Sequence, residues 1–166
     1  MNGTASSDPT EHSRWRPLRL LLEAMDGDIA RLYAEAQVSE LKPSWVMELL
    51  RLHAQGPMTI AELARSVERT HSAMSQKVAA MRAAGWVRTS AGSDARSKKV
   101  TLTAKASRIV GRLAAEWRAT EAAIAEIEEE MPYPMSQAVT DIEEALRRKS
   151  FHDRIAAKLN KDTAWR

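Results

Sequence analysis

The sequence predicts a mainly α-helical fold with one small β-hairpin. Apolar residues recur at helical spacing along most of the chain, and one short stretch after residue 85 changes to period two. Gly or Pro stands at most of the changes between these stretches. Of the 166 residues, 44% are hydrophobic and 28% are charged, a balance typical of a globular protein with a real core.

The first expected helix follows a polar start of the chain. Residues 1–14 lack apolar periodicity, so we predict a flexible tail there. Residues 15–40 are predicted to hold one long amphipathic helix. Its apolar stripe comprises Leu18, Leu21, Leu22, Met25, Ile29, Leu32 and Tyr33.

Two helices are expected between residues 41 and 67. Pro43 suits the first turn of the earlier helix, and the pair Gly56 and Pro57 is expected to end it. Thr59 and Glu62 have the spacing of a capping box, in which each side chain bonds to the backbone amide of the other residue. The sequence therefore predicts that a short helix starts at this point.

The next helix is expected to start near Thr70 and to end before Gly85. Met74, Val78 and Met81 lie at i, i+4 and i+7, which predicts a buried stripe. The opposite face of this helix is then left to solvent or to a partner.

Period-two patterning at residues 86–90 and 98–102 predicts two strands joined by a turn at residues 91–96. Thr103 is suited to cap the helix that follows. Two short helices, a tight turn and a hairpin together make a winged helix-turn-helix, which we assign to residues 41–103.

Residues 104–166 are predicted to form further helices, interrupted by Pro132 and Pro134. Like residues 15–40, they carry more apolar surface than a winged helix needs for its own core. We therefore predict that the N- and C-terminal helices flanking the winged helix are dimerisation helices and that the chain forms a homodimer.

Charge is distributed unevenly. Residues 44–105 contain ten basic and four acidic residues, a balance of +6, whereas residues 106–150 have a balance of −3. No acid occurs between Thr70 and Ala91. These features predict double-stranded DNA as the partner, with the helix in the major groove and Arg96 in the minor groove.

The candidate DNA contacts are polar or basic side chains on two elements. On the recognition helix they are Thr70, His71, Ser72, Ser75, Gln76 and Lys77, and on the wing they are Arg88, Arg96, Lys98 and Lys99. A wetted helix face and an ordinary charged turn would look similar, so a winged helix that binds protein without reading DNA stays open as the alternative.

Other classes of function have little support in the sequence. There is no cysteine, the four histidines are scattered without the spacing of metal ligands, and no phosphate-binding glycine loop is present. We expect no catalytic residues, no metal, no cofactor and no enzyme activity. The sequence shows no signal peptide and no membrane-spanning run, so we expect a cytoplasmic protein without a membrane partner.

The wing resembles that of the MarR family of bacterial regulators. In that family an Asp-x-Arg sequence is followed, after five residues, by Leu-Thr, and Asp94, Arg96, Leu102 and Thr103 match this pattern. Supporting matches are Gly56, Pro57, Met58, Thr59, Ile60, Leu63, Ala64, Ser75, Gly85, Trp86 and Val87. One departure is Gln76, at a position where the family often has Arg.

The resemblance implies a dimeric transcriptional regulator, commonly a repressor, that binds a pseudo-palindromic operator. It implies that Asp94 orients the wing by pairing with a basic neighbour. It also implies release by a small aromatic or anionic effector, bound between the dimer helices and the DNA-binding module. Met25, Trp45 and Trp117 are candidates for lining such a pocket, although a place in the core or in a dimer interface explains each of them more readily.

Overall fold

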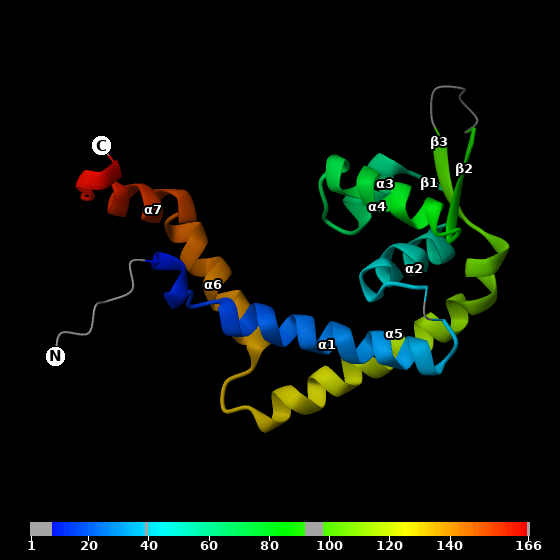
Figure 1. Ribbon diagram of the computed structural model, residues 1–166, viewed down its shortest axis with the longest axis horizontal. Coiled ribbons are helices and arrows are strands. Elements are labelled where there is room, and N and C mark those ends of the chain that lie inside the picture. Colours follow the sequence, from blue (N-terminus) through cyan, green and yellow to red (C-terminus); the bar gives the residue numbers. More distant parts are fainter. Residues whose placement is uncertain (1–7, 39, 92–97, 166) are drawn as a thin grey trace. The chain divides into compact units, whose positions relative to one another are not determined.

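The computed structural model describes residues 8–38, 40–91 and 98–165. The chain divides into two compact units, Met1–Ala114 and Ala115–Arg166. Figure 1 labels the elements of both units, which are described separately below. The division falls within one long helix, whereas the sequence placed its domain boundaries between elements.

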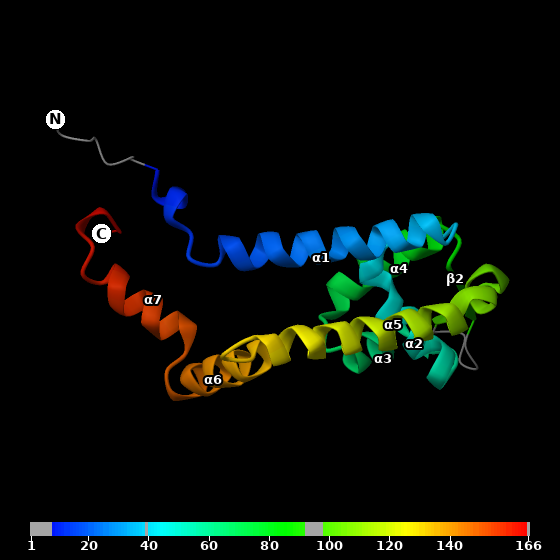
Figure 2. The same ribbon diagram turned by 90° about the horizontal axis from the view of Figure 1, so that it is seen from below.

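The first unit begins with a 3-10 turn, η1 (Pro9–His12), followed by the helix α1 (Arg16–Glu35). The turn lies in the segment that the sequence assigned to a flexible tail, and the Asp8 carboxylate accepts a hydrogen bond from the Thr10 amide there. Figure 2 shows α1 as one continuous helix. It ends at Glu35, and Gln37, two residues further on, has a φ of 59° in the left-handed region.

The helices of the winged module follow the predicted order. They are η2 (Pro43–Trp45), α2 (Val46–Gln55), α3 (Ile60–Ser66) and α4 (His71–Ala83). Gly56 ends α2 with a φ of 79°, a conformation that glycine adopts without steric cost. The predicted capping box at the start of α3 is confirmed, since Thr59 and Glu62 each bond to the backbone amide of the other.

Three short antiparallel strands complete the module: β1 (Met58–Thr59), β2 (Val87–Ala91) and β3 (Lys98–Leu102). The strand order is β1-β3-β2, so β3 pairs with both neighbours. The hairpin of β2 and β3 was predicted, whereas β1 was not. Figure 1 shows β2 and β3 extending beyond α3 and α4 as a wing.

The core of the first unit lies between α2, α3, α4, the sheet and the first turns of α5 (Ala104–Glu130). Its fully buried large side chains are Val46, Glu48, Leu49, Leu63, Met74, Met81, Trp86, Val87 and Val100. The predicted stripe of α4 is confirmed, because Met74, Val78 and Met81 are all buried. The face opposite this stripe is therefore exposed within the unit.

The second unit contains the rest of α5, then α6 (Met135–Arg148), α7 (Phe151–Leu159) and η3 (Thr163–Trp165). The Glu128 carboxylate near the end of α5 accepts hydrogen bonds from both the amide and the hydroxyl of Ser136, which joins α5 to α6. None of residues 115–165 is buried. The apolar stripe of α6, Met135, Val139, Ile142 and Leu146, is exposed.

Within the described residues, no helix is both long enough and apolar enough to cross a bilayer.

Candidate nucleic-acid interface

The candidate interface is built on α4, whose start is fixed by Thr70. The Thr70 hydroxyl accepts a hydrogen bond from the Ala73 amide at 3.3 Å and so caps the helix. With its apolar stripe packed on α3 and β2, α4 presents the opposite face to solvent. The predicted residues Thr70, His71, Ser72 and Gln76 are exposed, while Ser75 and Lys77 are half-buried.

The turn between α3 and α4 places basic residues beside the start of α4. Glu68 adopts a φ of 52°, and the Arg69 amide donates to the Ala64 carbonyl at 2.9 Å. These bonds end α3 and turn the chain towards α4. Arg65 and Arg69 are exposed next to the recognition helix, as is Arg82 in its last turn. The sequence prediction omitted these three arginines, although as basic residues flanking α4 they were detectable.

Lys77 is engaged inside the protein. Its ammonium lies 2.7 Å from Glu48 Oε1 and donates to the Ser44 carbonyl oxygen at 2.8 Å. Glu48 belongs to α2 and is only 2% exposed, while its second oxygen, Oε2, has no hydrogen-bond partner among the described residues. The pair therefore ties the recognition helix to α2, a role that the sequence did not suggest.

The strands of the wing add further positive charge. Arg88 on β2 and Lys98 on β3 are exposed, and Lys99 is half-buried. Lys99 on β3 lies opposite Thr59 on β1, and its positive charge acts on the nearby carboxylate of Glu62. Hydrogen bonds from the Thr59 amide and hydroxyl lower the pKa of the Glu62 carboxyl, and Lys99 adds to this effect. The predicted wing residues Asp94 and Arg96 lie outside the described residues.

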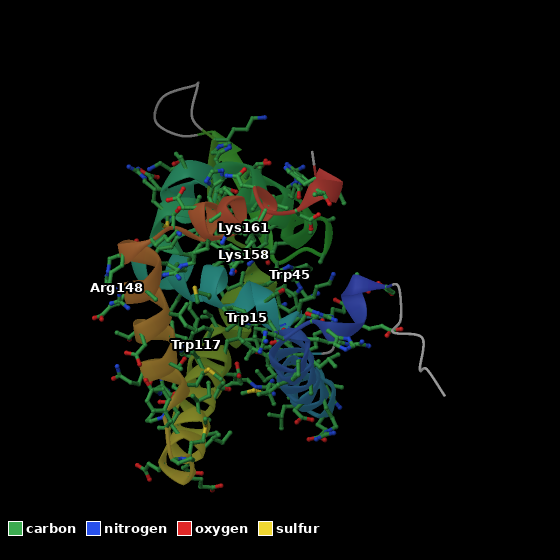
Figure 3. The ribbon with its side chains drawn as sticks, turned by 90° about the vertical axis from the view of Figure 1, so that its left-hand side faces the viewer. Trp15, Trp45, Trp117, Arg148, Lys158 and Lys161 are labelled. Atoms are coloured by element: carbon green, nitrogen blue, oxygen red, sulfur yellow. The ribbon has the colours of Figure 1, made fainter. Side chains whose placement is uncertain are left out.

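The predicted effector-pocket residues have different environments. Trp45 is buried in the core of the first unit, with the Lys42 ammonium 5.3 Å from its ring centre. Met25 is half-buried on α1, and Trp117 is half-buried on the part of α5 that belongs to the second unit. Figure 3 labels both tryptophans. Their role in a pocket stays a prediction.

In the described part of the chain, no group of three histidine, aspartate or glutamate side chains is placed to hold a metal ion. What the first unit does present is an exposed helix free of acids, preceded by a tight turn and followed by a basic hairpin. This arrangement defines a winged helix-turn-helix protein.

Comparison with known proteins finds a family that this module resembles. Residues 39–97 match the model of the MarR family. This match covers 59 of the 166 residues and agrees with the resemblance that the wing motif carries. The family consists of transcriptional regulators, which supports the expectation that the chain is not an enzyme. No curated protein is similar enough in sequence to count as a match.

Solved structures share the fold at low sequence identity. The MepR–DNA complex of S. aureus has a TM-score of 0.60 at 14% identity, covering 82% of this chain and 97% of that one. MosR of M. tuberculosis in complex with DNA has a TM-score of 0.58 at 20% identity, with coverages of 82% and 98%. A MarR protein of Peptoclostridium difficile has a TM-score of 0.55 at 19% identity, with coverages of 89% and 94%. These likenesses support the winged-helix fold.

Proposed function

We propose that the chain is a sequence-specific DNA-binding transcriptional regulator. The observation that carries this proposal is the exposed, acid-free face of α4 beside the basic strands of the wing. Small and hydrogen-bonding side chains on such a face allow close approach to base edges, and Gln76 is suited to adenine. Two structures of similar fold, MepR and MosR, were solved with DNA bound.

The first test is the salt dependence of binding to genomic duplex fragments selected by the protein. A protein that binds DNA through basic side chains loses affinity steeply as the salt concentration rises. The logarithm of its binding constant falls with the logarithm of the salt concentration, with a slope of about −0.9 for each phosphate contacted. Arg88→Gln is expected to weaken binding to all sequences alike and to reduce that slope by about one. Arg118→Gln, which removes the same charge from an exposed position in the second unit, is the matched control.

Gln76→Ala tests base reading rather than charge. It is expected to change base preference at one position in each half-site by about 1–3 kcal/mol, with the salt slope unchanged. A wild-type protein without any affinity for duplex DNA at low salt would contradict this role. If both it and the Gln76→Ala variant bind protein partners equally well, a protein-interaction module would be favoured instead.

We further propose that the regulator acts as a homodimer on a pseudo-palindromic operator. Apolar side chains remain exposed on α1 and α6, among them Leu21, Leu32, Val139 and Ile142. Isologous pairing buries such faces and sets two recognition helices about one DNA turn, roughly 34 Å, apart. Val139→Asp with Ile142→Asp is expected to yield monomers in light scattering, while a wild-type monomer would contradict the proposal.

A cytoplasmic repressor released by a small effector is the regulatory role we propose, since a dimer seated on an operator excludes other proteins from it. In transcription assays on a selected operator, the protein is expected to lower transcript yield. An increase would show that it is an activator.

A further inference from the structure

One cation of the recognition helix α4 is bound by a carboxylate of its own chain. The Lys77 ammonium lies 2.7 Å from Glu48 Oε1 and donates to the Ser44 carbonyl oxygen at 2.8 Å. The Glu48 side chain on α2 is 2% exposed, whereas the Lys77 side chain is 25% exposed. The carboxylate therefore lies inside the protein, while the lysine that binds it keeps one side in solvent.

Lys77 lies on the border between the buried and the exposed sides of α4. Gln76, which precedes it, is exposed, and so are Ala73 and Ala80, one turn before and one turn after it. Val78, which follows it, is buried in the core. Because a flexible four-carbon stem carries the ammonium, a lysine at this border can turn inward to a carboxylate or outward to a phosphate. In this structure it turns inward.

The buried carboxylate has the advantage over a DNA phosphate as a partner for Lys77. Coulomb attraction grows as the effective dielectric constant falls, and salt screens a solvated phosphate more than it screens a buried carboxylate. Loss of Lys77 would also leave Glu48 as a buried charge without its cation. The second oxygen of Glu48, Oε2, already lacks a hydrogen-bond partner among the described residues. We therefore expect Lys77 to stay on Glu48 when DNA is present.

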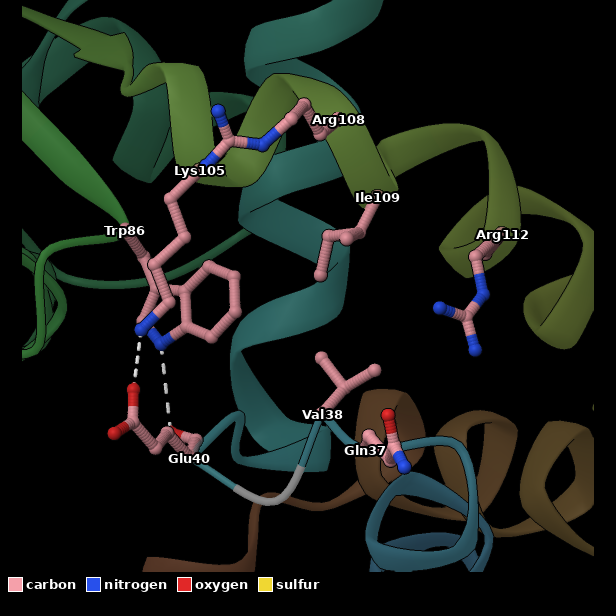
Figure 4. Close-up of a pocket in the computed structure, with 8 residues that line it drawn as sticks. All are labelled: Gln37, Val38, Glu40, Trp86, Lys105, Arg108, Ile109 and Arg112. Carbon is pink, nitrogen blue, oxygen red and sulfur yellow. Dashed lines mark hydrogen bonds and ion pairs between the residues drawn. The ribbon is translucent and has the colours of Figure 1, made fainter.

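The ion pair of Lys105 with Glu40, drawn in Figure 4, provides a contrast within the same unit. It also joins residues far apart in the sequence, but the Glu40 side chain is 73% exposed. None of the eight residues drawn in Figure 4 belongs to α4. The carboxylate that binds the lysine of the recognition helix is thus the buried one of the two.

We propose that Glu48 is a positioning residue that keeps Lys77 away from DNA phosphates. Phosphate contacts strengthen binding to all sequences alike, whereas contacts to base edges distinguish one sequence from another. With Lys77 neutralised, α4 binds DNA in general less tightly, and the uncharged side chains around Gln76 are left to read the bases. This role rests on the proposed DNA-binding function, and it removes Lys77 from the contacts that the sequence predicted.

The experiment compares variants of the full chain on two duplexes, a selected operator and a scrambled duplex of the same length and composition, over a series of salt concentrations. Glu48→Met removes the carboxylate and fills its place with an apolar side chain of similar size, which a buried site tolerates well. The double variant Glu48→Met with Lys77→Met has the net charge of the wild type but no lysine. Urea denaturation establishes that each variant is folded under the binding conditions.

Glu48→Met is expected to steepen the salt slope by about 0.9, the value for one further phosphate contact. At low salt it is expected to bind the scrambled duplex about two- to fivefold more tightly, the range for one exposed charge pair. The double variant is expected to have the slope of the wild type, because the paired Lys77 contributes nothing to it. A purely structural role for Glu48 would weaken binding without steepening the slope.

Glu40→Gln is the matched control, since it removes the same charge and releases Lys105 instead of Lys77. It is expected to keep the slope of the wild type. Glu48→Gln, which retains an oxygen to accept from Lys77 but not the charge, is expected to lie between the wild type and Glu48→Met. It also provides a second variant with a polar side chain at this buried position.

Three results would overturn the role of Glu48 while leaving DNA binding in place. A slope that is shallower by about one in the double variant than in the wild type would show that Lys77 already contacts phosphate. A wild-type slope for Glu48→Met would show that the released lysine finds no phosphate. An equal steepening by Glu40→Gln would assign the effect to net charge. A wild-type protein that does not bind either duplex refutes the proposed function itself, before any variant is compared.

Discussion

The winged module and the C-terminal unit carry apolar stripes of similar regularity, but the stripe is buried in the first and exposed in the second. Met74, Val78 and Met81 on α4 are buried against α3 and the sheet, whereas the stripe of α6 has no buried member. Both patterns have helical spacing. Periodicity therefore identifies the apolar face of a helix, but it does not say whether the same unit supplies the surface that covers it.

The largest expected effect contrasts a core leucine with an exposed one. Leu63→Ala opens a cavity at a fully buried position and is expected to lower the free energy of unfolding by about 2–5 kcal/mol. Leu146→Ala on α6 removes the same atoms from a side chain that is 38% exposed. It is expected to leave hydrogen exchange of the α4 amides unchanged. Similar loss of protection in both variants would show that the two units share one core.

The second prediction concerns the buried pair between Lys77 and Glu48. Lys77→Met leaves a buried carboxylate without its cation and is expected to destabilise the module by about 3 kcal/mol, measured by urea denaturation. The double variant Lys77→Met with Glu48→Met removes both charges, so it is expected to recover most of that loss. A double variant as unstable as the single one would contradict a dominant role for the unpaired charge.

Some features of the winged module are predictable from the sequence, and others are not. Three kinds of signal were predictable because each depends on residues close together in the sequence. They are the capping box at Thr59, the glycines at positions 56 and 85, and the apolar stripe of α4. The partner of Lys77 lies 29 residues away in α2, and nothing local distinguishes this lysine from a free one. Tertiary packing alone decides that its charge is engaged.

The missed strand has a different cause. β1 is only two residues long, which is too short for period-two alternation to be recognised. It is a strand because it pairs with β3 in antiparallel orientation, with Met58 opposite Val100. The ion pair between Glu40 and Lys105 was also not predicted, since the two residues lie 65 positions apart in the sequence.

A smaller effect is expected from the cap of α3. Thr59→Ala removes the acceptor for the Glu62 amide and is expected to cost about 1 kcal/mol in thermal or urea unfolding. The wild type should also be sensitive to acid. Because the pKa of Glu62 is lowered in the folded state, its contribution is present above the ordinary value of 4.5 and is lost as the pH falls through the folded pKa.

Glu62→Gln separates these two effects, because its amide oxygen still accepts from the Thr59 backbone but does not titrate. It is expected to flatten the acid limb of the stability curve. An acid limb identical to that of the wild type would assign the pH dependence to other carboxylates.

The smallest effect is expected from the matching cap in the C-terminal unit. The Ser150 hydroxyl accepts from the Asp153 amide at 3.1 Å and caps α7, which has no buried residue. Ser150→Ala is expected to lower the helicity measured by circular dichroism slightly. The free energy of unfolding of the winged module is expected to stay within about 0.5 kcal/mol of the wild-type value. A shift as large as that of Thr59→Ala would make the comparison between the units invalid.

The pairing of β3 with β1 has a consequence for how any ligand meets the wing. Through Met58 and Thr59, the wing strand is bonded to the chain just where α3 begins, so the root of the hairpin has little freedom to swing as a separate arm. The entropy of aligning β2 and β3 with the helices is thus lost when the protein folds, before any partner arrives. Association then requires less ordering of this part of the surface.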